Sequence, residues 1–215
     1  MLMNNFFDKI YCINLDRRTD RWDEVSKLFE DNKLVVERHS AFDGKKELTL
    51  PYPSSAELAG AISHRDVILK AKELGLKNVL VFEDDVDVIE NINGVFDFIK
   101  NFIPNDWDMI YFGGNHVGGL IQVNQYFFRC LRTYALHMYA VNEKSYDLII
   151  KYLSDKIKWT LEGKQSLKPS VAADYFVGDL HNIINCYGIK PRIAWQKEGY
   201  SDIQEDIINY DFLRD

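Results

Sequence analysis

Residues 79–87 read Val79-Leu80-Val81-Phe82-Glu83-Asp84-Asp85-Val86-Asp87. The four apolar residues predict a strand that is buried on both faces of a sheet. Four carboxylates follow within five positions, and a bound cation commonly relieves the repulsion within such a cluster. Because open α/β sheets bind ligands at the carboxyl ends of their strands, the cluster indicates an oxygen-ligand site for Mg²⁺ or Mn²⁺. The spacing leaves open a solvated turn whose acids cap the next helix.

Length and composition describe a globular domain, which we expect to span residues 1–215. Hydrophobic residues make up 47% of the chain and charged residues 27%, which is ordinary for a globular protein. The net charge of −7 argues against a nucleic-acid partner, which needs a basic face, and against binding to an anionic membrane. No apolar stretch approaches the ~20 residues of a membrane-spanning helix, so we expect no membrane insertion.

Cysteine usage and the N-terminus bear on the compartment. Cys12, Cys130 and Cys186 are widely spaced and form no C-x-x-C pair, which predicts reduced, buried thiols. The first residues lack a cationic region followed by an apolar run, the pattern of a signal peptide. We therefore expect a cytoplasmic location. The sequence is compatible with a homo-oligomer.

The chain begins with a predicted strand over Lys9–Leu15, which is rich in β-branched and aromatic residues. A turn over Asp16–Arg21 follows, with Thr19 as the expected N-cap of the next helix. The three arginines of this turn suit a grip on phosphate or carboxylate. Surface ion pairs with neighbouring acids are the alternative.

The second predicted strand covers residues 34–38. Ser54 and Glu57 stand at capping-box spacing and predict a helix that Gly75 ends. His64 lies on the packed face of that helix, where a hydrogen-bonded core histidine and a cleft residue are both reasonable interpretations.

The second half of the chain alternates strand and helix patterns again. A buried strand over residues 108–112 opens into a glycine-rich loop, 113–119, whose four glycines suit either close backbone approach to a ligand or a merely mobile loop. One or two strands over 126–141 precede a helix that Asn142 caps and that runs to Leu153. The polar stretch with Gly163 and Pro169 predicts a flexible lid.

Ser170 is the expected cap of a further helix. On that helix Asp174, Gly178, His181 and Asn185 would share one polar face. The last strand is predicted over residues 189–195. The alternation of strands and helices indicates an α/β fold with a mainly parallel, mixed sheet flanked by helices.

Three blocks in this order resemble glycosyltransferase family 25, which includes bacterial lipooligosaccharide galactosyltransferases and procollagen galactosyltransferases. Residues 13–21, Ile-Asn-Leu-Asp-Arg-Arg-Thr-Asp-Arg, are similar to its opening "INL-x-RR-x-DR" block. Residues 57–64 resemble "E-x-x-G-C-x-x-SH", with Ala61 in place of the usual cysteine. Residues 81–86 resemble "x-LEDDV", and the resemblance continues weakly to Tyr200-Ser201-Asp202.

The resemblance implies a single-domain, GT-A-type (Rossmann-like) fold and a metal-dependent, inverting transfer of a hexose from a UDP-sugar. The hexose would be of the galactose or glucose type, and the acceptor a hydroxyl of a glycan or of a hydroxylysine-like, collagen-like protein. The implied metal is Mn²⁺, with Mg²⁺ as the second choice, held by Asp85 and, less securely, Asp87. The implied donor-binding residues are Asn14, Leu15, Asp16, Arg17, Arg21, Ser63, His64, Glu83 and Asp84.

An inverting displacement also needs a base that takes the proton of the acceptor hydroxyl. We expect Asp174 in this role, with Asp202 as the second candidate. A phosphoacceptor receiver domain does not fit, because its acidic pair follows the first strand, and here that strand ends in Asn14-Leu15-Asp16-Arg17-Arg18. A non-catalytic nucleotide-sugar or glycan-binding module with the same fold remains the alternative.

Overall fold

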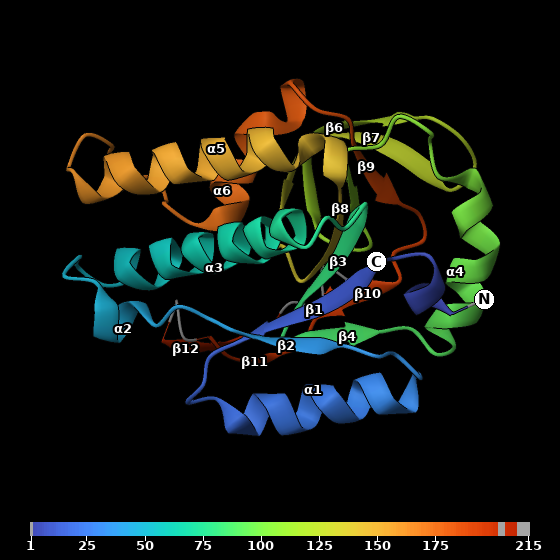
Figure 1. Ribbon diagram of the computed structural model, residues 1–215, viewed down its shortest axis with the longest axis horizontal. Helices are drawn as coiled ribbons and strands as arrows, with labels where there is room; N and C mark the ends of the chain where they lie inside the picture. The colour runs from blue at the N-terminus through green and yellow to red at the C-terminus, as the bar shows by residue number, and fades with distance from the viewer. Residues whose placement is uncertain (1, 202–204, 210–215) are drawn as a thin grey trace.

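An eight-stranded sheet organises the chain, of which the computed structural model describes residues 2–201 and 205–209 (Figure 1). The strands lie in the order β2 (Glu37–Ser40), β1 (Lys9–Asn14), β3 (Asn78–Glu83), β8 (Met138–Asn142), β5 (Met109–Tyr111), β9 (Cys186–Ile189), β7 (Phe127–Tyr134) and β6 (Asn115–Gln122). Six strands share one direction, and β7 and β8 run against them. The predicted α/β fold with a mixed, mainly parallel sheet is confirmed.

Helices cover both faces of this sheet (Figure 1). One face carries α3 (Ser54–Glu73), α5 (Glu143–Leu161) and α6 (Ala173–Gly178). The other face carries α1 (Thr19–Asp31) and α4 (Ile92–Ile99). The remaining short elements are α2 (Gly44–Glu47) and the 3-10 turns η1 (Met3–Asn5), η2 (Lys100–Phe102) and η3 (Asp179–Asn182). Two further antiparallel strand pairs are β4 (Val86–Val88) with β10 (Ala194–Gln196) and β11 (Gly199–Ser201) with β12 (Asp206–Ile208).

Strand β3 has the predicted double burial. Val79 and Val81 pack into the core under α3 and α5, and Leu80 and Phe82 pack into the core on the side of α1 and α4. All four side chains are 0% exposed. Alternate side chains of a strand point to opposite faces, so this strand supplies both cores of the sheet. The three cysteines are free and buried, as predicted.

Three of the helix starts differ from the prediction, because the expected cap residues do not occupy the N-cap positions. Thr19 is the first helical residue of α1, and the N-cap is Arg18. Ser54 is likewise the first residue of α3, after Pro53, whose ring presets a helical φ. The expected capping box is wrong, since Glu57 accepts a hydrogen bond from the distant Val171 backbone N–H at 3.1 Å. The N-cap of α6 is Ala172 rather than Ser170.

Other boundaries shift as well. Asn142 does cap α5, which continues to Leu161. The second strand is β2, about three residues later than predicted, and the expected strand over 189–195 is divided at Pro191, which has no N–H to donate. The prediction of a loop over residues 113–119 is wrong from Asn115 onward, where the chain forms strand β6.

The predicted long polar helix after Ser170 is also wrong. Helix α6 ends at Gly178, and His181 is buried in η3 with its Nε2 atom 2.8 Å from the Tyr111 hydroxyl. His181 therefore does not share a polar face with Asp174. Within the described residues, no helix combines the length and the apolar composition needed to cross a membrane.

Two glycines test how closely α2 packs on α3. A Cβ atom at Gly44 would lie 2.1 Å from the Ser55 carbonyl oxygen, whereas nothing lies within 4 Å of a Cβ at Gly60. We expect Gly44→Ala to lower the free energy of unfolding by about 1–3 kcal/mol, because backbone must move. Gly60→Ala, in mid-helix, should leave it unchanged or raise it by about 0.5–1 kcal/mol. Urea denaturation measures both, and equal stability of the two variants would contradict the packing argument.

Candidate active site

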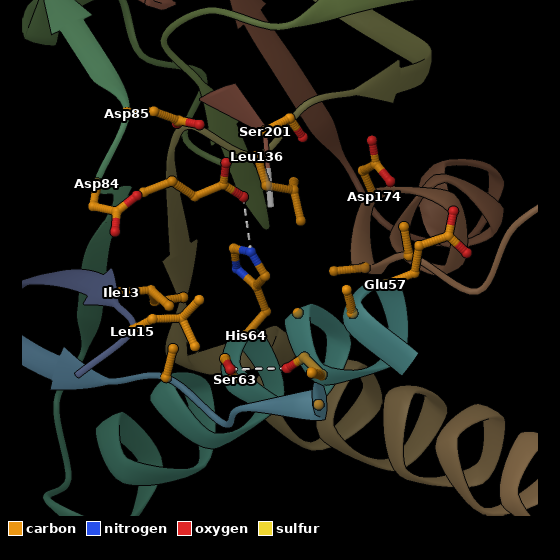
Figure 2. A pocket seen from close by; sticks show the side chains of 18 of the residues that line it. Ile13, Leu15, Glu57, Ser63, His64, Asp84, Asp85, Leu136, Asp174 and Ser201 are labelled. Carbon is orange, nitrogen blue, oxygen red and sulfur yellow. Dashed lines mark hydrogen bonds and ion pairs between the residues drawn. The ribbon is translucent and has the colours of Figure 1, made fainter. Parts of the chain in front are cut away.

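A pocket of about 460 Å³ opens at the carboxyl ends of β1 and β3. It is lined by most of the residues that the sequence predicted for the site, namely Asn14, Leu15, Arg17, Arg21, Ser63, His64, Glu83, Asp84, Asp85 and Asp174. Figure 2 shows Asp84 and Asp85 on one side of this pocket and Asp174 on the other, with His64 and Leu136 between them. Donor-side and acceptor-side candidates thus share one cavity.

The parallel register of β1 and β3 brings the first and third family blocks together. Ile13 pairs with Glu83, so both strands end at the same level of the sheet. Asn14, which is 1% exposed, then donates from Nδ2 to Asp84 Oδ2 at 2.6 Å. Its Oδ1 atom accepts from Arg38 Nε at 2.7 Å. Asn14, at the end of β1, therefore orients Asp84, which follows the neighbouring strand β3.

Arg21 is the cation of the acidic cluster. Its Nη1 atom lies 2.7 Å from Asp84 Oδ1 and 3.5 Å from Asp85 Oδ2, and Nη2 donates to the Tyr200 carbonyl at 2.6 Å. Its side chain is 18% exposed. By contrast, Arg18 pairs with its neighbour Asp20, and Arg17 donates to Asp43 from the pocket wall. Arg18 thus forms the surface ion pair that was the alternative interpretation, whereas Arg21 binds the acids of the pocket.

Burial sets the protonation of the acids. It raises the pKa of Asp85 to about 6, with the Glu83 charge adding to the shift and Arg21 and the Gln196 amide opposing it. The pKa of Asp84 is also raised, by burial and by the charge of Asp85, against the influence of Arg21 and Asn14. The ionised forms of both carboxylates are therefore disfavoured, and added positive charge would stabilise them.

Asp85 has one satisfied and one unsatisfied oxygen. Oδ2 accepts from Gln196 Nε2 at 2.8 Å, but Oδ1 is buried and has no hydrogen-bond partner. A buried, unpartnered carboxylate oxygen is costly and suits a cation ligand. Within residues 2–201 and 205–209 no group of three His, Cys, Asp or Glu side chains has metal-binding geometry. A cation here would take Asp85 as a ligand and need further ligands from its substrate or water.

His64 holds Glu83 in place. Its Nε2 atom lies 3.0 Å from Glu83 Oε1, and its Nδ1 atom lies 2.8 Å from the Tyr139 hydroxyl. An ionised carboxylate only accepts hydrogen bonds, so we assign the proton to Nε2 and the Tyr139 hydroxyl as the donor to Nδ1. His64 as a residue is 4% exposed yet lines the pocket, so it is both a hydrogen-bonded core histidine and a cleft residue. Ser63 turns its hydroxyl to the Ala59 carbonyl and accepts from Phe42 N–H.

Asp174 stands on the opposite wall, in the first turn of α6. Its Oδ2 atom accepts from the Ala135 backbone N–H at 2.9 Å. Ala135 has a φ of 66°, which a non-glycine residue seldom adopts. The turn between β7 and β8 therefore presents its N–H to one carboxylate oxygen and fixes Asp174 toward the pocket (Figure 2).

Three predicted residues lie elsewhere. Asp16 is 67% exposed and pairs with Arg38 at 2.8 Å, outside the main pocket. Asp87 belongs to β4, does not line the pocket, and accepts from Val88 N–H. Asp202 lies outside the described residues. Sequence reasoning missed the lining residues Asp43, Lys45, Glu57, Asn115, Tyr134 and Gln196. For Glu57 the signal was its place at the head of the second family block.

The comparison with known families agrees with this geometry. The model of glycosyltransferase family 25 (LPS biosynthesis protein) matches residues 7–160, which include the acidic cluster and the residues of β1 and α3 that line the pocket. The chain belongs to glycosyltransferase family 25. The GT-A-type fold expected for the family 25 chain is confirmed, with the acidic cluster at the end of β3 in a mixed, mainly parallel sheet.

Individual relatives match parts of the chain. A glycosyltransferase 25 family member of Drosophila pseudoobscura pseudoobscura is 33% identical over 127 residues, covering 49% of this chain and 20% of that protein. Procollagen galactosyltransferase 2 of Homo sapiens is 30% identical over 129 residues, covering 50% and 21%. The match thus spans about a fifth of the length of these relatives. The crystal structure of a glycosyltransferase involved in the glycosylation of the major capsid of PBCV-1 covers 76% of this chain and 70% of that one, at 11% identity and a TM-score of 0.44.

The raised pKa of Asp85 predicts a pH-dependent stability. The pKa of Asp85 is about 6 in the folded protein, against an ordinary value of 3.8, so Asp85 ionises less readily when folded. Its contribution to stability is therefore fully present below pH about 4 and is lost as the pH rises through 6. In EDTA, Asp85→Asn should be more stable than wild type by about 1–3 kcal/mol at pH 8, and the gain should vanish near pH 4. Chemical denaturation at each pH measures this. A gain that is constant with pH would contradict the burial of an ionised Asp85.

Proposed function

We propose that this chain is a metal-dependent, inverting glycosyltransferase that moves a hexose from a UDP-sugar to a hydroxyl of a glycan or of a hydroxylysine-like protein side chain. The observation that carries the proposal is that one pocket contains both the Glu83-Asp84-Asp85 cluster and, across the cavity, the fixed carboxylate of Asp174. The relative named as a procollagen galactosyltransferase supports galactose as the hexose and a protein hydroxyl as one acceptor.

The charge of the pocket supports the metal. Six carboxylates line it, from Asp43, Glu57, Glu83, Asp84, Asp85 and Asp174, against the cations Arg17, Arg21 and Lys45. Each of these cations already has a carboxylate partner. A nucleotide diphosphate adds negative charge, so its binding needs a further cation. The unpartnered Oδ1 of Asp85 would hold Mn²⁺, or Mg²⁺ as the second choice.

When bound, the metal neutralises the diphosphate and stabilises the charge on the departing UDP. The protein's own groups prepare the donor side of the pocket. Glu83, oriented by His64, and Asp84, oriented by Asn14 and Arg21, present carboxylate oxygens suited to ribose hydroxyls. Arg21 lies beside both acids, so its guanidinium would also contact an anionic ligand bound there. Asp87 does not line the pocket, so the proposal rests on Asp85 as the protein's metal ligand.

Asp174 is the proposed base. In a single displacement the acceptor oxygen attacks the anomeric carbon from the face opposite UDP, and its proton passes to a carboxylate. The Ala135 N–H holds one oxygen of Asp174, which keeps the side chain from rotating away. Its place across the pocket from Asp84 and Asp85 is where an acceptor would approach (Figure 2).

Metal removal tests the donor half of the proposal. UDP release from a panel of UDP-sugars should stop in EDTA and return with Mn²⁺. Asp85→Asn should abolish release while keeping the fold, because it removes the proposed ligand. Asp87→Asn, its matched control outside the pocket, should keep near-wild-type release. Full activity in EDTA, or an active Asp85→Asn variant, would refute the metal assignment, and UDP binding without release would favour a non-catalytic binding module.

The acceptor half has its own test. We expect Asp174→Asn to bind UDP and Mn²⁺ as wild type does in calorimetry, and to lose turnover by about 10²–10⁴-fold, the contribution of a positioned base. The amide keeps an oxygen for the Ala135 N–H, so the fold should survive. Turnover within a few-fold of wild type would move the role to Asp202, which the same substitution then tests.

A further inference from the structure

The two edges of the eight-stranded sheet differ in charge. Edge strand β2 carries Glu37 and Arg38, and Glu37 pairs with Lys9 and Lys70. Edge strand β6 carries no charged side chain, and neither does any residue from 109 to 128, although 27% of the chain is charged. Its one titratable residue, His116, is kept neutral because burial lowers its pKa to about 3. Proteins normally place charges on edge strands to prevent pairing with other chains.

The outer part of β6 is also apolar and open to solvent. Leu120 is 51% exposed and Ile121 55%, and Val123, just beyond the strand, is 47% exposed. We call these three residues the edge patch. On the side away from β7, β6 has no strand neighbour in the part of the chain that the structure describes. Unpaired backbone groups beside exposed apolar side chains form a surface suited to strand addition.

We propose that the edge patch pairs with the same strand of a second copy of this chain, antiparallel across a two-fold axis. A two-fold axis places a segment against itself, so a charge at the axis would meet its own copy in the second chain. The chain carries a net charge of −7, so two copies carry like net charge and repel each other overall. An uncharged edge adds no local repulsion between facing like charges to this overall repulsion.

The geometry of β6 suits a short, regular pairing. The register with β7 shifts between Val117 and Leu120, where Gly118 and Gly119 have φ values of 78° and 103°. Beyond this bulge, residues 120–122 pair regularly with β7. A two-fold axis beside Ile121 would place Ile121 against Ile121 of the second copy, an apolar cross-strand pair. It would also join the two sheets into one.

The pairing segment is separate from the proposed catalytic machinery. Asn115, at the other end of β6, lines the pocket, but the bulge lies between it and the edge patch. None of Leu120, Ile121 and Val123 lines the pocket. Substitutions in the edge patch therefore test association alone, and their outcome is independent of whether the chain transfers a sugar.

Analytical ultracentrifugation of the whole chain tests the proposal. We expect wild type to sediment with twice the 25.1 kDa mass of the chain at micromolar concentrations, and to dissociate on dilution. Ile121→Lys should sediment as the single chain, because two lysines would face each other. Val35→Lys changes an apolar residue that is 77% exposed next to the opposite sheet edge, and it should remain dimeric. A monomeric wild type at all concentrations, or a dimeric Ile121→Lys, would overturn the proposal.

A second variant tests the geometry directly. Ile121→Cys should give a covalent dimer with a short bis-maleimide, since facing positions of paired strands are roughly 4.5–5.5 Å apart at Cβ. Val35→Cys is the matched control and should not cross-link. The native cysteines are buried, so the introduced thiol is the reactive one. Equal cross-linking of the two variants would mean that a dimer, if present, uses another surface, and would reject the edge patch.

Discussion

The guanidinium of Arg21 is the interaction on which the pocket depends. It lies 2.7 Å from Asp84 and 3.5 Å from Asp85, which follow Glu83 directly at the end of a buried strand. Without this positive charge, three partly desolvated carboxylates would repel one another at low effective dielectric constant. The same guanidinium binds the Tyr200 carbonyl, so hairpin β11–β12 is tied to the acidic cluster.

The sheet topology explains why the far wall of the pocket can face that cluster. Strand β8 runs against β3, and Met138 pairs with Phe82, so the chain enters β8 at the carboxyl end of β3. The turn before β8 therefore brings Ala135 and Leu136 to the pocket. Ala135 then binds Asp174 through its N–H. The reversed strand β8 thus connects the pocket wall that carries Asp174 to the wall that carries the acidic cluster.

Burial disfavours the protonated form of three of the histidines. It lowers the pKa of His137 and of His181 to about 4, and that of His116 to about 3. His181 binds the Tyr111 hydroxyl, and His64 is held between Glu83 and Tyr139. These histidines support the fold or orient an acid. His116, His137 and His181 do not line the pocket, whereas the carboxylate of Asp174, the proposed base, does.

The sequence by itself determined what depends on neighbouring residues: the doubly buried strand β3, the acids after it, the cap at Asn142 and the three family blocks. Only the tertiary structure decided which of these acids enter the pocket, because the next strand, β4, pairs with β10 and Asp87 does not line the cavity. It also decided that Arg21 rather than Arg18 meets the cluster, and that Glu57 binds residue 171 instead of capping its helix. These bonds join residues 63 and 114 positions apart, so local sequence patterns do not encode them.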